Sequence, residues 1–281
     1  MALTINTNLS SLIVQKNLSS ATTSLNNAIE RMTTGYKINH AKDNAAGFSI
    51  AESWKTKIGS LDIASENASM GADLLKTTEE NYSLITEHLQ RVRDLTEQAA
   101  NGTYGSDSLK AIASEMTARL NEIDRIAANA EFNGISLMKG KGSEINLQIG
   151  IDATTNSRIS LEAGLFEGAT SKDLLKVEIA DFVKSAASTA KASGQLTVLD
   201  AAISNISTRQ TAIGAAQNRV ESAISSITVQ SENLTSSLST IRDADVANES
   251  SSYIKAQILQ QASATLLATA NQAPSIALNL I

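Results

Sequence analysis

The chain lacks cysteine altogether and contains a single proline, Pro274, among its 281 residues. The absence of cysteine excludes a disulfide framework, thiol catalysis and thiolate metal sites. Because proline costs about 3 kcal/mol inside a helix, a chain that avoids it can form long uninterrupted helices. The two histidines, His40 and His88, have no other histidine near them, so zinc chemistry is not expected. The sequence predicts no metal and no other cofactor.

Aromatic residues and positive charge are also scarce. Phe, Trp and Tyr together make up 3% of the chain, which disfavours a compact core built around large rings. Small side chains instead suit helices that pack closely along their lengths. The formal net charge is −6 at pH 7, which argues against a general nucleic-acid-binding protein.

Long hydrophobic runs are missing as well. No apolar stretch approaches the roughly 18 residues of a membrane span, and no membrane association is expected. The first residues lack the basic and apolar regions of a cleaved secretory signal. Composition alone favours a cytoplasmic protein. A protein exported by a dedicated apparatus would have the same composition, so both locations stay open at this point.

A seven-residue repeat of large aliphatic residues dominates the C-terminal half. The repeat is formed without a gap by Leu199, Ile206, Ile213, Val220, Ile227, Leu234 and Ile241. Companion apolar residues three or four positions away complete an a/d seam between residues 196 and 241. At about 1.5 Å per residue, such a helix is about 70 Å long. A rod of this kind suits an assembly subunit better than an enzyme.

A second long helix is predicted after a loop at residues 36–45. Its seven-residue repeat consists of Leu61, Ala68, Leu75, Tyr82 and Leu89. The turn-forming residues 101–106 end it. A third amphipathic helix then carries apolar residues at helical spacing from Leu109 to Ala127.

The middle of the chain changes its periodicity. Asn133-Gly134 is a strong turn pair, and apolar residues alternate from Ile145 to Ile151 and again at Ile159 and Leu161. This pattern predicts a β-hairpin region at about residues 133–165. A short helix is expected at about residues 172–191, with a joint at Ser193-Gly194 before the C-terminal rod.

Both ends of the chain show one apolar helical face. The N-terminal face includes Leu18, Leu25 and Met32, and the C-terminal face includes Ile254, Ile258 and Leu266, up to Pro274. We expect residues 1–44 and 242–281 to form paired terminal helices, and residues 45–241 to form a rod domain. A two-helix pair leaves apolar surfaces that need further partners, so self-association is expected. The predicted fold is mainly α, a long antiparallel helical coiled-coil bundle with a small β-hairpin region and paired terminal helices.

Several blocks of sequence resemble bacterial flagellins, in the same order and over nearly the whole chain. They lie at residues 5–8, 30–39, 41–47, 89–95, 98–103, 131–134, 242–245 and 256–262. The resemblance implies a secreted, extracellular subunit that polymerises into the flagellar filament. Its terminal helices would form the inner tube and its long helices the surrounding shell. The short segment between about residues 140 and 194 implies that large outer domains are absent.

The resemblance also implies partners. It implies export through the flagellar type III apparatus, an export chaperone at the C-terminal helix, and filament cap and junction proteins. In similar flagellins, residues matching Arg91, Leu95 and Glu115 contact the animal Toll-like receptor for flagellin. Arg91, Leu95 and Gln98 lie opposite the stripe that contains Tyr82, so Leu95 is expected on an outward face. A solvated or filament-packing face is the alternative, since single exposed leucines are common.

Two other classes of protein compete with the filament subunit. The cytoplasmic hairpin of a chemoreceptor is also a long antiparallel coiled coil, but it would need a membrane span or adaptor segment and a helical tip. A flagellar hook-filament junction protein shares the terminal helices but does not propagate. An enzymatic role has no support, because Asp243 and Asp245 have no general acid, histidine or glycine-rich pocket beside them and are better placed to start a helix.

Overall fold

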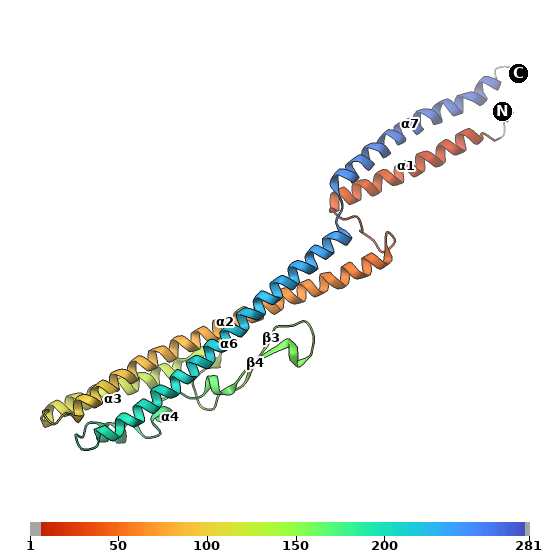
Figure 1. The fold of residues 1–281 in the computed structure, drawn as a ribbon. Helices are drawn as coiled ribbons and strands as arrows, with labels where there is room; N and C mark the ends of the chain where they lie inside the picture. The colour runs from red at the N-terminus through yellow and green to blue at the C-terminus, as the bar shows by residue number, and fades with distance from the viewer. Residues whose placement is uncertain (1–6, 279–281) are drawn as a thin grey trace. The chain divides into compact units, whose positions relative to one another are not determined.

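The computed structural model describes residues 7–278, with the backbone alone described from 273 onward. The chain divides into two compact units, Met1–Ile58 with Glu232–Ile281, and Gly59–Ser231. Most of the described chain is helical (Figure 1). The two longest helices, α2 (Ala45–Ala100) and α6 (Ala192–Arg242), each contribute residues to both units.

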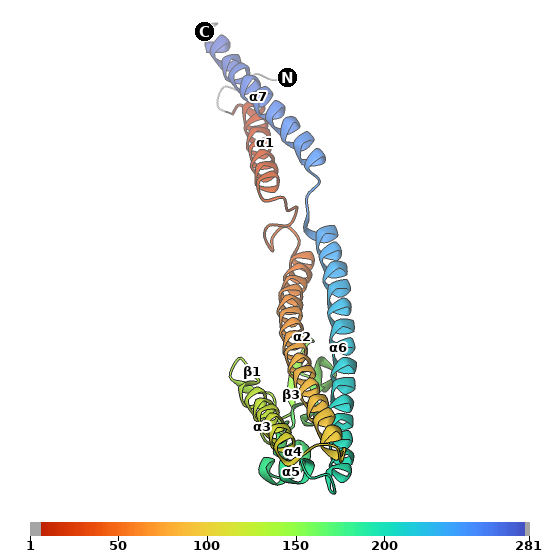
Figure 2. The same ribbon diagram turned by 90° about the vertical axis from the view of Figure 1, so that its left-hand side faces the viewer.

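The terminal unit contains an antiparallel pair formed by α1 (Leu9–Thr34) and α7 (Val246–Leu278), which lie side by side in both views (Figures 1 and 2). The start of α1 is capped by Asn8, whose Oδ1 accepts a hydrogen bond from the Ser11 amide at 3.0 Å. Gly35 ends α1 at a φ of 75°, a left-handed conformation that glycine adopts without strain. The Asp245 carboxylate accepts hydrogen bonds from the first amides of α7, as predicted for a helix start.

The connections at residues 35–44 and 243–245 are tied to each other within the terminal unit. Tyr36 and Asp243 form an isolated antiparallel bridge, and the amide of Lys37 donates to the carbonyl of Arg242 at 2.7 Å. The Arg242 guanidinium lies 4.4 Å from the centroid of the Tyr36 ring and pairs with Glu52 at 3.1 Å. A cation–π contact and an ion pair therefore stabilise the place where the two connecting segments contact each other.

In the second unit α2 and α6 run antiparallel (Figure 1), and the predicted seam residues that lie in this unit are buried. The seam residues of α2 are all buried, namely Leu61, Ala68, Leu75, Tyr82 and Leu89. Those of α6 are buried from Leu199 through Ile206, Ile213, Val220 and Ile227. Leu234 and Ile241 belong to the terminal unit and are half-buried. The seven-residue period thus marks the buried side of both helices, as coiled-coil packing requires.

The third helix, α3 (Ser106–Asn129), completes the bundle of the rod unit. Its side chains Met116, Leu120 and Ile123 are fully buried in the same core. Two short helices pack on it, α4 (Ser171–Leu175) and α5 (Ile179–Ala186). Sequence analysis predicted one helix at about 172–191, and this was wrong. Lys176 adopts a left-handed φ of 59°, which interrupts the helix without glycine or proline.

Two further helix ends differ from the predictions. Gly194 lies inside the first turn of α6 rather than at a joint, since α6 already begins at Ala192. The backbone of α7 continues past Pro274 to Leu278, although we expected the helix to end there.

The predicted β-hairpin region contains two small antiparallel sheets. The first pairs β1 (Glu131–Phe132) with β2 (Ile135–Ser136) around Asn133 and Gly134, whose φ values of 48° and 80° are those of a type I′ turn. The second pairs β3 (Ile145–Gln148) with β4 (Arg158–Leu161). Two short 3-10 turns, η1 (Thr155–Ser157) and η2 (Ala163–Phe166), flank β4.

A polar clamp attaches the segment after β4 to the rod. The Tyr82 hydroxyl donates to the carbonyl of Leu165 at 3.1 Å, and burial raises the pKa of this phenol. The Arg209 guanidinium donates to the carbonyls of Glu167 and Gly168 at 3.1 and 3.2 Å and pairs with the Glu167 carboxylate. Residues from α2 and α6 therefore hold the same loop.

Gly71 of α2 allows the second hairpin to pack closely against this helix. A Cβ atom at Gly71 would overlap the side chain of Leu147 in β3. The Asn67 side chain donates to the carbonyl of Gln148 at 3.2 Å and fixes the strand one turn away. The hairpin can approach α2 closely only because position 71 has no side chain.

We expect the Gly71→Ala variant to be destabilised by about 1–3 kcal/mol, because the added methyl overpacks the contact with Leu147. Gly59→Ala is the matched control, since the same helix has open space at that position. There the higher helix propensity of alanine should stabilise the protein by up to about 1 kcal/mol. Urea unfolding of both variants measures the difference, and equal effects would contradict the close contact.

Candidate assembly surface

Small residues line the contact between α1 and α7. Ala21 and Ala28 of α1 are 6% and 3% exposed, and Ala256 and Ser263 of α7 are 4% and 8% exposed. Helices whose facing side chains are this small can bring their backbones close together. The pair is therefore held by short-range packing that uses few large apolar groups.

Polar side chains fix the register of the pair at several points along its length. The Asn8 side-chain amide donates to the carbonyl of Ala270 at 2.8 Å. Near the middle, the Gln260 amide donates to the Thr22 hydroxyl at 3.1 Å. Toward the other end, Arg31 pairs with Glu249 at 3.2 Å. These contacts confirm the predicted pairing of the two terminal segments.

The large apolar side chains of both helices lie mostly outside this contact. Among those that lie outside it, the exposed fraction ranges from 38% for Met32 to 67% for Leu9. The exposed set on α1 is Leu9, Leu12, Ile13, Ile29 and Met32, and that on α7 is Val246, Ile254, Ile258, Leu259 and Leu266. Single exposed apolar residues are normal, but so many on two helices indicate a surface for a partner.

The predicted residues of this region fall into two groups. Leu18 and Leu25 are half-buried and share the α1 face of Ala21 and Ala28. Met32, Ile254, Ile258 and Leu266 are exposed. Ile254 and Ile258 lie outside the contact with α1, because α7 uses Ala256 and Ser263 for that contact, whereas Leu266 lies at the edge of the groove between the two helices. Residues 1–6 and 279–281 of the predicted terminal segments lie outside the described residues.

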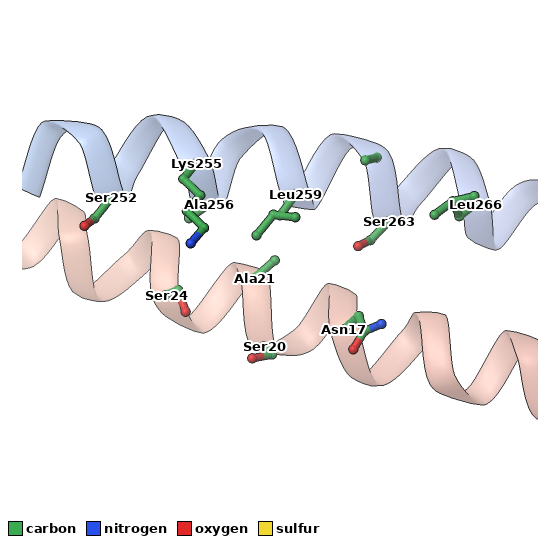
Figure 3. A pocket seen from close by; sticks show the side chains of 11 residues that line it. Asn17, Ser20, Ala21, Ser24, Ser252, Lys255, Ala256, Leu259, Ser263 and Leu266 are labelled. Carbon is green, nitrogen blue, oxygen red and sulfur yellow. The ribbon is translucent and has the colours of Figure 1, made fainter.

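A groove of about 630 Å³ runs between α1 and α7 (Figure 3). Serine side chains from both helices line it together with Asn17 of α1, Lys255 of α7 and apolar side chains that come mostly from α7. The lining residues are Asn17, Ser20, Ala21, Ser24, Ser252, Lys255, Ala256, Leu259, Ala262, Ser263 and Leu266. The groove is continuous with the exposed apolar side chains of α7, since Leu259 and Leu266 belong to both.

The predicted receptor face on the rod differs from expectation at one residue. Leu95 is 2% exposed and belongs to the hydrophobic core. The helical projection placed it outward because it considered one neighbouring helix. In the structure α3 also packs on α2, and its Ile112 and Met116 share the core with Leu95. The expectation that Leu95 is exposed was wrong.

The other residues of that face do reach the surface. The Arg91 guanidinium donates to Glu115 Oε1 with both Nε and Nη2 at 2.9 Å. Arg119 approaches the same carboxylate at 3.8 Å, and Gln98 is exposed. Arg91 and Glu115 therefore form an ion pair that bridges α2 and α3.

Within residues 7–278, no group of three or more metal-ligating side chains could hold an ion. In the same part of the chain, no helix has the length and apolarity needed to cross a membrane.

Comparison with known proteins agrees with this geometry. Residues 5–143 match the bacterial flagellin N-terminal helical region, and residues 196–281 match the bacterial flagellin C-terminal helical region. The flagellin of Bacillus subtilis (strain 168) is 36% identical over 301 residues, with 99% of both chains covered. The flagellin of Xenorhabdus nematophila is 35% identical over 314 residues and covers 100% of both.

Among solved structures, a putative flagellar hook-associated protein from Vibrio parahaemolyticus has the same fold. Its TM-score is 0.61 at 12% identity, covering 72% of this chain and 100% of that one.

Long coiled-coil helices, paired terminal helices and an exposed apolar surface on that pair are features of a subunit that assembles with other protein chains. The chain belongs to the bacterial flagellin family, in a short form. It is a structural subunit of the extracellular flagellar filament, and the family match does not favour the alternative of a junction protein.

Replacing Leu95 by alanine should destabilise the protein by about 2–5 kcal/mol, because it opens a cavity between α2 and α3. Leu84→Ala is the matched control, since Leu84 lies on the same helix and is 48% exposed. That variant should change the free energy of unfolding by no more than about 0.5 kcal/mol. Chemical unfolding measures the free energy of both variants. Equally small changes for Leu95→Ala and Leu84→Ala would contradict the burial of Leu95.

Proposed function

We propose that the exposed apolar faces of α1 and α7 drive polymerisation by packing against the same helices of neighbouring subunits. Residues 1–44 and 242–281 would then form the inner tube of the filament. Residues 45–241 would form the surrounding shell. The observation that carries this proposal is the set of large aliphatic side chains that the two terminal helices leave exposed while they pair through alanine and serine.

The energetics favour this arrangement. Burying one leucine or isoleucine contributes about 1.5–3 kcal/mol, and the two helices expose several such residues. A helix pair held by small residues is only marginally stable alone, since most helical stability comes from packing of an apolar face. Polymerisation would therefore stabilise the terminal helices as well as join the subunits.

The exposed apolar side chains of α1 and α7 also suggest which proteins bind the subunit before and after assembly. We propose that an export chaperone covers α7 before type III export, because Ile254, Ile258 and Leu266 would otherwise be open to aggregation. Cap and junction proteins would meet the terminal helices at the filament ends. The proposed role is entirely structural, with no catalytic step and no cofactor.

The double variant Ile254→Ser, Ile258→Ser tests the polymerisation surface. Both side chains are more than half exposed, so the monomer should keep its helicity. The loss of two buried isoleucines should raise the critical concentration for polymerisation by at least about 100-fold. Sedimentation and electron microscopy after seeding measure this, with circular dichroism as the check on folding.

Gln261→Ser is the control for this experiment, because Gln261 is exposed on the same helix and carries no large apolar group. It should polymerise as the parent protein does. Filaments of normal length and critical concentration from the double variant would refute the proposed surface.

A second proposal concerns the rod surface. We propose that Arg91, Gln98 and Glu115 contact the animal Toll-like receptor for flagellin, with Leu95 acting only as the buried support beneath them. Arg91 offers several donors in a fixed plane, and Glu115 holds this plane in position at 2.9 Å. The resemblance to receptor-binding flagellins and the exposure of this ion pair support the proposal.

Arg91→Ala should weaken receptor binding by about 2 kcal/mol or more if Arg91 is an anchor of the contact. Arg93→Ala is the matched control, because Arg93 lies on the same helix and is paired with Asp200 on α6. Surface binding measurements with the monomeric protein compare the two variants. Equal binding by both would leave the Arg91 surface without a role in receptor recognition.

A further inference from the structure

The chain contains two exposed asparagine–glycine pairs that no part of the assembly function uses, Asn101-Gly102 and Asn133-Gly134. In such a pair the backbone nitrogen of glycine is unusually accessible, because glycine has no Cβ to shield it. We propose that Asn101 is a site of spontaneous deamidation in the folded protein, while the fold protects Asn133.

The surroundings of Asn101 favour the reaction. The residue follows the last residue of α2 and begins an exposed loop at residues 101–105. The amide of Thr103 donates to Asn101 Oδ1 at 3.2 Å. This hydrogen bond draws the side chain over the backbone of Gly102. It also places a donor on the oxygen that gains negative charge when the side-chain carbon is attacked, which stabilises that charge.

The reaction needs water alone as its co-reactant. Hydroxide removes the proton from the backbone nitrogen of Gly102 and becomes water, and this nitrogen attacks Asn101 Cγ to form a C–N bond. The Cγ–Nδ2 bond then breaks as Nδ2 takes a proton from water and leaves as ammonia, which regenerates hydroxide. The product is a cyclic succinimide. Water then opens this ring at one of its two carbonyls, which gives either aspartate or isoaspartate.

The backbone of Asn133 opposes the same reaction. Asn133 and Gly134 have φ values of 48° and 80° at the tip of the first hairpin. The pairs Phe132–Ile135 and Glu131–Ser136 hold both sides of this turn. Ring closure requires Asn133 Cγ to approach the backbone nitrogen of Gly134. The backbone rotation at Asn133 that brings these two atoms together would break the type I′ turn. Asn101 has no strand pair on either side of its loop among the described strands. Two backbone hydrogen bonds hold it, from Asn101 N to the Gln98 carbonyl at 3.1 Å and from Tyr104 N to the Asn101 carbonyl at 3.5 Å, and neither of them uses the Gly102 nitrogen.

Deamidation would change both the charge and the backbone at this position. Asn101 lines a small depression with Asp94, Glu97, Gln98 and Tyr104. A third carboxylate would therefore appear beside two existing ones, and the net charge of −6 would become one unit more negative. Isoaspartate would also lengthen the backbone of the connection between α2 and α3. In an extracellular filament subunit, aspartate and isoaspartate at position 101 would thus accumulate with time.

The test compares folded and denatured full-length protein during prolonged incubation at mildly alkaline pH. Peptide mass spectrometry follows the replacement of amide by acid at each asparagine, and isoaspartate methylation identifies the lengthened backbone. In the folded protein, Asn101 should deamidate at least as fast as in the denatured chain. Asn133 should deamidate severalfold more slowly than in the denatured chain.

Two variants complete the experiment. Gly102→Ala should slow the reaction at Asn101 severalfold without changing Asn133. Thr103→Pro removes the amide donor and should lower the folded-to-denatured rate ratio at Asn101. Slower reaction of Asn101 in the folded than in the denatured protein would overturn the proposal. Equal rates for Asn101 and Asn133 in the folded protein would overturn it as well.

Discussion

The close packing of α1 against α7 through small residues is the constraint on which the account of this protein depends. Alanine and serine let the helices approach, and this contact leaves the larger aliphatic side chains without a place inside the pair. A single chain therefore forms the right local structure but buries too little apolar surface to stabilise it strongly. Neighbouring subunits can supply the missing surface, which couples folding of the ends to assembly.

The rod unit has the opposite character. Its seam and its third helix bury a continuous set of large aliphatic residues, with Tyr82 fully buried among them. Arg209 and Tyr82 donate hydrogen bonds to the loop after β4. The side chain of Leu147 packs directly against Gly71. The rod unit thus buries its hydrophobic core within one chain, and we expect it to keep its structure without neighbours. A well-packed rod unit with exposed apolar side chains on its terminal helices suits a subunit that assembles into a filament.

The sequence predicted the parts of the fold that repeat. A seven-residue period indicates burial against one neighbouring helix, and it predicted a seam from Leu199 through Ile241, of which Leu199 through Ile227 are buried. The pair Asn133-Gly134 was sufficient to predict a turn. Features that depend on a third element were missed. Leu95 lies in the core that α2 shares with α3, which no period on α2 alone can reveal. The left-handed φ of 59° at Lys176 interrupts the predicted helix, and no glycine or proline marks this position in the sequence. The expectation of an outward Leu95 was therefore wrong, while the receptor role of Arg91 stays a prediction.

Amide hydrogen exchange in the monomer and in the filament tests the central claim most directly. If intersubunit packing stabilises the terminal helices, the amides of α1 and α7 should exchange quickly in the monomer. They should slow by at least about 100-fold in the filament. Amides of α2 and α6 around the seam should be protected in both states. Equal protection of α1 and α7 in monomer and filament would contradict the account, because the ends would then be stable without neighbours.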